Sequence, residues 1–453
     1  MDIFSPLLSI APEYFPLLCN QYFRTSLRGD YESLERAPID AQIAWKWAKP
    51  VIDKDEPHEL RVLFDPNSNR PNCVGACRKI EKELKKTVRG CSCFYIESTR
   101  KPVELLSEDC SLIFHDRIRV INPFRCIVLI TTMLHHIWRK NRRLVGHIMR
   151  LLPQILRSLI IIQSRIYEAR RVLRENHITW FITPNEQSGI SSVFLVAARL
   201  EGIKVGQFLH GMPTRLYTPS FSDVFWIWGP VTARMLQCKR HDSYSEIIET
   251  GSLEFSGEPA VIQKEEISGQ EIGKYRLLIL SQLIGDDLWK TTAFSKAMET
   301  MALAMSELDE WHVVIRIHPQ ADRYIKEKLE HLFAEVGCAY SYSSTEALDQ
   351  DIAESDFVCT ASSSGIIEAI IQKKPLCLVW NEELEKIHGD SFLPREMVTR
   401  TVDELISMVS ATKSLSNELC QSAITELMGS VEASRLVCQN IISNAPLRTL
   451  SKS

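Results

Sequence analysis

The feature of this sequence that most restricts its fold is a regular alternation of short apolar strands with amphipathic helices, which occurs in two separate series. In the first series, residues 178–183 and 203–209 are predicted strands, and residues 188–202 between them are a predicted helix that ends at Gly202. In the second series, strands and helices alternate in the same way from residue 275 onward. Strands that are joined through helices pair in parallel and carry the helices on the faces of the sheet. The sequence therefore predicts an α/β fold with two such units.

The length and one irregular stretch predict where the units divide. A chain of 453 residues exceeds what one hydrophobic core usually serves. Residues 253–273 lose the apolar periodicity and are rich in Gly, Pro and Glu, as linkers are. We therefore expect an N-terminal domain over 1–252, a C-terminal domain over 274–430, and a helix and tail over 431–453. Residues 125–175 predict long helices, which would form a helical insertion in the N-terminal domain.

The charge and the N-terminus limit the partners and the location. A formal net charge of −4 with a pI near 6.3 gives no general attraction to nucleic acid, so we expect no nucleic-acid partner. The first residues carry an early acid and two prolines without a basic lead-in, which does not resemble a signal peptide. We therefore expect a cytoplasmic location.

A basic cluster within the predicted helical insertion leaves two interpretations open. The apolar run before it, residues 124–138, is shorter than the roughly 20 residues that span a bilayer and contains two histidines, so we predict no transmembrane helix. The cluster is either a solvated helix face or a peripheral contact with anionic headgroups on the inner face of the cytoplasmic membrane. Its residues are Arg139, Lys140, Arg142 and Arg143.

The cysteines predict thiols rather than a metal centre. Thirteen cysteines, an odd number, are scattered through the chain and predict reduced side chains in a cytoplasmic protein. Cys73, Cys77, Cys91 and Cys93 cluster in the sequence, but their spacing differs from the paired C-x2-C pattern of zinc sites. We predict no metal there.

Polar residues follow several predicted strands at the point where each strand ends. In an open parallel sheet, ligands bind beyond the carboxyl ends of the strands, because loop amides and helix N-termini meet there. The recurrence of polar residues at these ends predicts a ligand cleft. The residues are Asn185, Glu186, His210, Ser281, Gln282, His318, Ser362, Ser363 and Ser364.

The three serines form the most informative of these strand ends. Their hydroxyls and backbone N–H groups, with Gly365 and the start of a predicted helix, suit a phosphate or diphosphate. Glu368, about one helical turn further on, is placed to reach ribose hydroxyls beside that phosphate. The alternative is ordinary serine N-capping of the helix, with Glu368 in a capping box.

His318 lies between an apolar strand and Pro319, which stops the strand and directs the imidazole out of its end. His318 can there bind a phosphate oxygen or stabilise a leaving phosphate. Arg316 falls on the same side by strand alternation and can add positive charge. The alternative is a histidine that satisfies loop carbonyls.

Glu186 and His210 are the candidate general bases. The alternative for Glu186 is an acid at a helix N-terminus with Asn185 as the cap, and for His210 a histidine bonded to the following loop. Gly211, directly after His210, would let the backbone come close to a bound molecule. The sequence contains no P-loop and no G-x-G-x-x-G, which argues against an ATPase or a dinucleotide enzyme.

Taken together, "HG" with "SDVFWIWG", "RIHP" and "ASSSGIIEA" resemble GT-B glycosyltransferases of bacterial surface polysaccharide assembly. Within these, the histidine-proline followed by a serine pair is similar to polysialyltransferases and Kdo transferases of capsule and lipopolysaccharide synthesis, which use CMP-activated sugars. CDP-glycerol polymerases have a related layout. The resemblance covers residues 178–380 and implies two Rossmann-like domains that face a cleft.

The resemblance implies a metal-independent glycosyltransferase without a cofactor. It would move an acidic sugar, of the Kdo or sialic acid type, from a CMP-activated donor to a glycan or glycolipid acceptor. The donor nucleotide would bind the C-terminal domain, with His318, Ser362 and Ser363 at its phosphate. The base would be Glu186, as in sialyltransferase-like members, or His210, as in glycerophosphate polymerases. The alternatives are a CDP-glycerol-type glycerophosphotransferase, a transferase that uses a UDP- or GDP-sugar, and a non-catalytic scaffold of the same fold.

Overall fold

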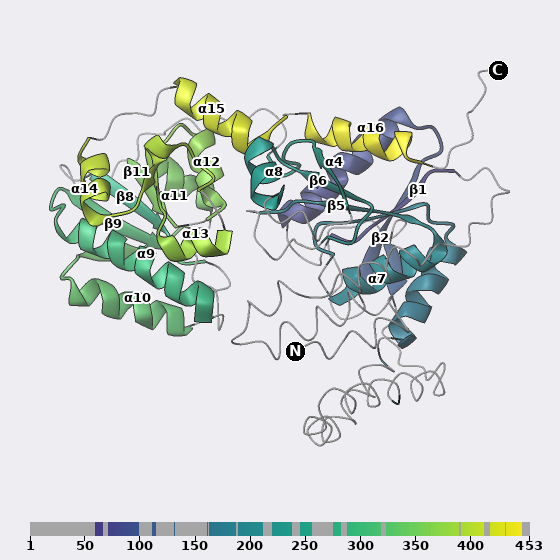
Figure 1. Cartoon of the computed structure of the whole chain (residues 1–453), viewed down its shortest axis with the longest axis horizontal. Coiled ribbons are helices and arrows are strands. Elements are labelled where there is room, and N and C mark those ends of the chain that lie inside the picture. The colour runs from purple at the N-terminus through teal and green to yellow at the C-terminus, as the bar shows by residue number, and fades with distance from the viewer. Residues whose placement is uncertain are drawn as a thin grey trace.

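The computed structural model confirms the predicted α/β class. Within the residues that it describes, two parallel sheets carry helices on their faces, and the two units lie side by side (Figure 1). The described residues are 59–66, 71–98, 111–114, 131, 161, 163–186, 189–211, 220–237, 245–255, 275–281, 288–318, 323–345, 347–361, 363–388, 391–411, 417–430 and 432–445.

The N-terminal sheet has the order β3-β2-β1-β4-β5-β6-β7, and every neighbouring pair is parallel. The order reverses at β1, which lies between β2 and β4. This reversal is the topological switch point, where doubly wound folds place their ligands. The strands are β1 (Arg61–Phe64), β2 (Ser92–Ser98), β3 (Ser111–Phe114), β4 (Trp180–Thr183), β5 (Lys204–Phe208), β6 (Val224–Ile227) and β7 (Glu246–Glu249).

Both faces of this sheet are buried, which explains why its central strands are continuously apolar. On one face, Trp180 and Ile182 of β4 belong to a core that also includes residues of α4 (Pro71–Thr87) and α16 (Ala433–Ser443). On the other face, Phe181 packs on Phe194 of α7 (Gly189–Glu201), with 5.7 Å between the ring centroids.

The C-terminal sheet has the order β10-β9-β8-β11-β12-β13, again with all neighbours parallel. This is the strand order of a Rossmann domain, and the switch point lies at β8, between β9 and β11. The strands are β8 (Tyr275–Leu280), β9 (Trp311–Arg316), β10 (Tyr340–Tyr342), β11 (Phe357–Thr360), β12 (Leu376–Val379) and β13 (Val398–Thr399).

The helices of the C-terminal domain form two groups by their contacts. In the first group, α9 (Leu288–Ser306) contacts α10 (Arg323–Glu335), α13 (Glu382–His388) and α14 (Val402–Ser410). In the second group, α11 (Leu348–Glu354) contacts α12 (Gly365–Ile371). A 3-10 turn over Arg395–Met397 leads into β13.

Two helices at the C-terminal end of the described chain connect the domains (Figure 1). Helix α15 (Asn417–Met428) contacts both α12 of the C-terminal domain and α8 (Pro230–Gln237) of the N-terminal domain. Helix α16 then packs on α4, and the indole N–H of Trp226 donates a hydrogen bond to Oδ1 of Asn440 over 3.1 Å. The segment predicted as a C-terminal helix and tail therefore contributes a helix to the core of the N-terminal domain.

Three glycines allow chain segments to cross at this connection. A Cβ on Gly251 would lie 1.9 Å from the carbonyl oxygen of Ser430, and one on Gly429 would lie 2.3 Å from that of Trp228. Both glycines also have positive φ values, +98° and +68°. A Cβ on Gly229 would lie 2.8 Å from the backbone nitrogen of Gly429. Only glycine fits where the backbones approach this closely.

The structure differs from the sequence prediction in some boundaries and adds elements. Helix α4 begins at Pro71, earlier than the charged helix predicted around residues 77–88, and β7, β10 and β13 were not predicted. Of the predicted helical insertion, residues 163–175 are described and helical, whereas the basic cluster Arg139, Lys140, Arg142 and Arg143 lies outside the described residues. Among the helices that the structure describes, none combines the length and apolar character needed to cross a bilayer.

Candidate functional site

The carboxyl ends of β9, β8 and β11 are joined by hydrogen bonds at the switch point of the C-terminal sheet. The backbone N–H of Ser281, directly after β8, donates to the carbonyl oxygen of Arg316 in β9 over 3.0 Å. On the other side, the hydroxyl of Thr360 in β11 donates to the carbonyl oxygen of Leu280 over 2.9 Å. Ser281 therefore lies between the two loops that carry the predicted phosphate-binding residues.

Ser281 is one of the two polar residues that the sequence places directly after β8. Its side chain is only 3% exposed, and its Oγ has no hydrogen-bond partner among the described residues. Buried hydroxyl groups are almost always hydrogen-bonded, so an unpartnered one at a switch point indicates a place for a ligand or a water molecule. The other predicted residue at this strand end, Gln282, lies outside the described residues.

The serine loop after β11 is arranged around Ser363. Its N–H donates to the hydroxyl of Thr360, and its Oγ accepts the N–H of Gly365, each over 3.2 Å. Ser364 precedes α12 and makes no side-chain capping bond, so the capping alternative is not formed by this residue. A Cβ on Gly365 would lie 3.0 Å from the Leu280 side chain, and the glycine thus brings the loop close to β8. Ser362 lies outside the described residues.

Glu368 lies in the first turn of α12, and its Oε2 is buried without a hydrogen-bond partner among the described residues. Burial raises the pKa of this carboxyl to about 7; its own backbone N–H lowers the pKa, and the charges of Glu254 and Asp349 raise it further. Because Glu254 follows β7 of the N-terminal sheet, this interaction also places Glu368 at the junction of the two domains.

Arg316 and His318 occupy the end of β9. The Arg316 guanidinium forms an ion pair with the fully buried Asp351 and donates to the carbonyl oxygen of Thr345 over 3.2 Å. It therefore ties the loop after β10 to α11, and its contact with a phosphate stays a prediction. His318 follows two residues later and is partly exposed, whereas Pro319 lies outside the described residues.

In the N-terminal domain, the carboxylate of Glu186 holds the segment before β6. It is 3% exposed and accepts the backbone N–H groups of Phe221 over 2.7 Å and Ser222 over 2.9 Å. The hydroxyl of Ser220 adds a third bond over 3.3 Å. Burial raises the pKa of Glu186 to about 7, although these hydrogen bonds act to lower it. Both oxygens of the carboxylate are thus used in positioning the loop.

His210 is 6% exposed, and its Nδ1 lies 2.7 Å from the carbonyl oxygen of Pro184. Because a carbonyl oxygen only accepts hydrogen bonds, Nδ1 carries the proton, and Nε2 is the nitrogen that can accept one in the neutral ring. Asn185 follows Pro184 and donates its N–H to the hydroxyl of Thr183 over 3.2 Å. The structure therefore brings Asn185, Glu186 and His210 together through the loop after β4.

Gly211, after His210, has a φ of +74° and open space where a Cβ would lie. Glycine is therefore favoured at this position by the left-handed backbone conformation of the turn. It does not serve to avoid a clash with another described residue.

The sequence did not predict a buried polar network of Asp65, Ser191 and Thr183 at the N-terminal switch point. The hydroxyl of Ser191 in α7 donates to the carboxylate of Asp65, which follows β1, and the Thr183 hydroxyl donates to Ser191 over 3.0 Å. Asp65 has the same signal as the predicted residues, a polar side chain directly after an apolar strand. This network links β1, β4 and α7 beside the loop that carries Glu186.

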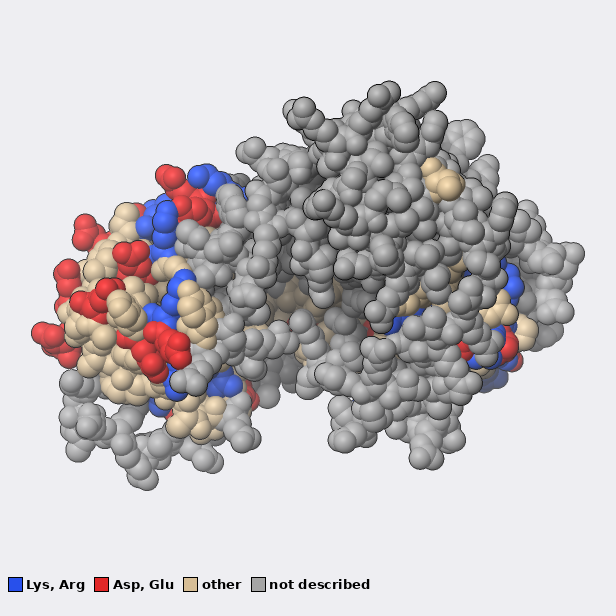
Figure 2. Space-filling model, turned by 90° about the horizontal axis from the view of Figure 1, so that it is seen from below, with Lys and Arg blue, Asp and Glu red and all other residues tan. Residues whose placement is uncertain are grey.

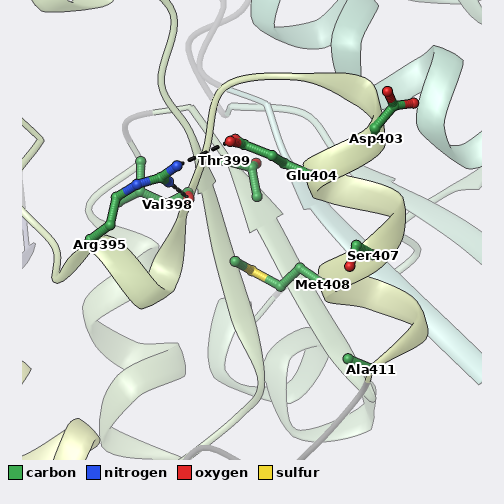
Figure 3. A pocket seen from close by; sticks show the side chains of 8 residues that line it. All are labelled: Arg395, Val398, Thr399, Asp403, Glu404, Ser407, Met408 and Ala411. Atoms are coloured by element: carbon green, nitrogen blue, oxygen red, sulfur yellow. Dashed lines mark hydrogen bonds and ion pairs between the residues drawn. The ribbon is translucent and has the colours of Figure 1, made fainter.

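The other features of the described surface do not add to this site. No group of three or more His, Cys, Asp or Glu residues that could hold a metal ion occurs within the described ranges. A hollow of about 520 Å³ lies beside the edge strand β13, two strands away from β11, and Arg395 there pairs with Glu404 (Figure 3). Figure 2 shows acidic and basic side chains intermingled on the C-terminal domain, at the left of the view.

Comparison with known proteins finds similarity at the level of structure. No protein-family model and no curated protein matches the sequence. A UDP-N-acetylglucosamine 2-epimerase from Listeria monocytogenes superimposes with a TM-score of 0.51 at 12% identity, over 85% of this chain and 96% of the epimerase. Sucrose-phosphate synthase from Thermosynechococcus elongatus superimposes with a TM-score of 0.52 at 10% identity, over 85% of this chain and 98% of the synthase.

At these low sequence identities, the superpositions show the fold and not the activity. Both neighbours align over most of the chain. Each of the two sheets also has the strand order of a Rossmann domain. The chain therefore has the GT-B fold, with two Rossmann-like domains.

Proposed function

We propose that this protein is a glycosyltransferase that takes a sugar from a nucleotide-activated donor bound at the C-terminal switch point. The observation that carries the proposal is the hydroxyl of Ser281, which is 3% exposed and has no hydrogen-bond partner in the described part of the chain. It lies between the strand ends that carry His318 and Ser363. A diphosphate or monophosphate oxygen would supply the hydrogen-bond acceptor that this hydroxyl lacks. GT-B enzymes use such a position for the donor nucleotide, as the sequence resemblance implies.

The proposed donor contacts divide between phosphate and ribose. His318, Ser281 and the serines after β11 would bind the phosphate, and His318 would stabilise the charge that develops on it as the sugar leaves. Glu368, whose Oε2 is buried without a partner among the described residues, would accept a ribose hydroxyl. With these groups at the phosphate, we propose that transfer needs no divalent metal.

For the general base, the contacts favour His210 over Glu186. Both oxygens of Glu186 accept hydrogen bonds from the loop over Phe221 and Ser222, so this carboxylate positions the wall of the acceptor side. His210 carries a proton on Nδ1 toward Pro184, so that in this tautomer the basic lone pair lies on Nε2, which would take the proton of an acceptor hydroxyl. The Pro184 carbonyl would also stabilise the imidazolium that forms.

We propose a CMP-activated acidic sugar, of the Kdo or sialic acid type, as the donor, and a glycan or glycolipid as the acceptor. This finer assignment is supported by the sequence resemblance. A second candidate is a UDP-sugar, since the Listeria neighbour is named for UDP-N-acetylglucosamine. CDP-glycerol is the third, because glycerophosphate transfer would use the same His210 base.

One assay distinguishes these donors. The protein is incubated with CMP-Kdo, CMP-sialic acid, UDP-N-acetylglucosamine or CDP-glycerol and an acceptor extract, and acceptor-dependent nucleotide release is measured. We expect CMP release from one of the CMP-sugars, and loss of that release in His210→Asn. Release of UDP alone would identify a UDP-sugar as the donor. Release of nucleotide from none of the four donors, with several acceptors tested, would favour the non-catalytic scaffold.

We propose that the protein acts in the cytoplasm, with a peripheral contact on the membrane through the basic cluster Arg139, Lys140, Arg142 and Arg143. Anionic headgroups would attract these side chains at about 1 kcal/mol each. Flotation with vesicles that contain anionic lipid tests the contact: the wild type should float, and a variant with all four residues changed to Glu should not. Equal flotation of both would rule out this surface.

A further inference from the structure

A pair of cysteines lies outside the proposed site, where the chain passes from α4 into β2. Cys91 and Cys93 stand two residues apart at the start of β2, and their Sγ atoms are 3.9 Å apart. Cys91 is partly exposed, whereas Cys93 is 4% exposed. The pair thus combines one thiol that solvent can reach with one thiol directly behind it.

We propose that Cys91 and Cys93 form a reversible disulfide by exchange with a small-molecule disulfide of the glutathione type. Both described thiols are free in this structure. The Sγ atoms need to approach by about 2 Å to reach bonding distance, which side-chain rotation and a small shift of the chain before β2 can supply. Gly90, with a φ of +79°, begins this segment directly before Cys91.

The surroundings favour Cys91 as the attacking sulfur. The Cys91 thiolate can accept the S–H of Cys93, which lowers the pKa of the Cys91 thiol. The nearby Lys85 ammonium lowers this pKa further, whereas burial and the Glu81 carboxylate raise it. The same interaction and burial raise the pKa of Cys93. Lys85 is held in place by Glu81 over 2.5 Å, and Glu81 also accepts the hydroxyl of Tyr95 over 2.6 Å. Thiolate character and exposure both determine which thiol reacts first.

The exchange proceeds in two balanced steps. The Cys91 thiolate attacks one sulfur of oxidised glutathione, forms a Cys91–glutathione disulfide and releases one glutathione thiolate. Cys93 then loses its proton, attacks the Sγ of Cys91 and releases the second glutathione. The two protein thiols lose two electrons and two protons, and one oxidised glutathione becomes two reduced ones. A ring closed over only three residues is strained, so dithiols should reverse the bridge readily.

The sequence allows a direct test on the full-length protein. Cleavage after Arg89 and Arg100 releases a tryptic peptide whose only cysteines are Cys91 and Cys93. The folded wild type is treated with oxidised glutathione without oxygen, alkylated, digested and measured by mass spectrometry. We expect this peptide to be unalkylated and two hydrogens lighter, and to regain both thiols after dithiothreitol.

Variants and an internal control identify the roles of the two thiols. Cys93→Ser should stop at the glutathione adduct on Cys91, and Cys91→Ser should leave Cys93 unmodified. Cys359 and Cys377, paired across β11 and β12 and both 0% exposed, should stay reduced under the same conditions. Two alkylated thiols in the treated wild type, a persistent glutathione adduct there, or equal modification of Cys93 in Cys91→Ser would overturn the proposal.

Discussion

His210 and Pro184 are joined by a hydrogen bond of 2.7 Å from the imidazole Nδ1–H to the proline carbonyl oxygen. This bond connects the loop after β5 to the loop after β4 and selects the tautomer in which Nε2 can accept a proton. We therefore propose His210, rather than Glu186, as the general base. Glu186, by contrast, uses both carboxylate oxygens on backbone N–H groups of the neighbouring segment.

The different roles of His210 and Glu186 predict different mutant phenotypes. His210→Asn should lower kcat by about 10²–10⁴-fold, the usual range for a general base, with little change in the melting temperature. Glu186→Gln should lower the free energy of unfolding by about 1–3 kcal/mol, because its amide NH2 would face a backbone N–H, while the folded protein stays active. Steady-state kinetics and urea unfolding measure these effects. The reverse pattern, an inactive but stable Glu186→Gln and an active His210→Asn, would exchange the roles.

Ser281→Ala separates a ligand-binding hydroxyl from a structural one. Because the Ser281 hydroxyl is buried without a partner among the residues that the structure describes, its removal should leave the free energy of unfolding of the unliganded protein unchanged or raise it by about 1 kcal/mol. The same variant should bind the donor nucleotide about 5- to 10-fold more weakly, which corresponds to the loss of one hydrogen bond. Calorimetric titration and urea unfolding give both values. Unchanged nucleotide affinity would show that Ser281 does not contact the ligand.

Glu368 should make the stability of the protein depend on pH. Its folded-state pKa of about 7 lies above the ordinary value of 4.5, so the folded state binds more protons between these values. The contribution of this group to stability is therefore greatest below pH 4.5 and is lost as the pH rises through 7. Glu368→Gln should remove this loss, and at pH 8 it should raise the free energy of unfolding by up to about 3 kcal/mol relative to the wild type.

The measurement for Glu368 is urea unfolding of wild type and variant at pH 5.5 and pH 8. Glu382→Gln, at an exposed position in the first turn of α13, is the matched control and should show the same small effect at both values. A stability difference between wild type and Glu368→Gln that does not change with pH would contradict the assignment.

Two glycines of the N-terminal domain should respond in opposite directions to alanine. A Cβ on Gly206 in β5 would lie 2.2 Å from the Trp226 ring, which is itself buried, so Gly206→Ala should destabilise the protein by about 1–3 kcal/mol. Gly75, inside α4, has nothing within 4 Å of its Cβ position, and Gly75→Ala should stabilise by about 1 kcal/mol. Thermal unfolding compares the two. Equal effects would mean that the Trp226 ring gives way without cost.

The strand ends show why the positions of the candidate residues could be predicted from the sequence. Parallel strands that are buried on both faces leave a continuous apolar run, so the polar residue that ends each run, such as His210 or His318, stands out. The edge strands β10 and β13 were missed because they have only three and two residues and carry no such run.

Other properties depend on distant residues and could not be predicted. The 35-residue separation between Glu186 and its partner Phe221 leaves no periodic signal in the sequence. Helices α16 and α4 pack together although they are more than 340 residues apart in the sequence. Through this contact the C-terminal helix becomes part of the N-terminal core. The position of Ser281 between β9 and β11 likewise depends on the strand order. Its neighbours in sequence do not indicate that its hydroxyl lacks a hydrogen-bond partner among the described residues.

The proposed function requires that a nucleotide binds between the ends of β9, β8 and β11. Its most direct test is calorimetric titration of CMP, CDP, UDP and GDP into the wild type and into His318→Ala. We predict that one nucleotide, CMP in our proposal, binds the wild type preferentially, and that His318→Ala, folded as judged by its melting temperature, binds it about 10- to 100-fold more weakly, as expected for a lost charged hydrogen bond. Equal affinity of both proteins for that nucleotide, or no binding of any of the four, would contradict the account.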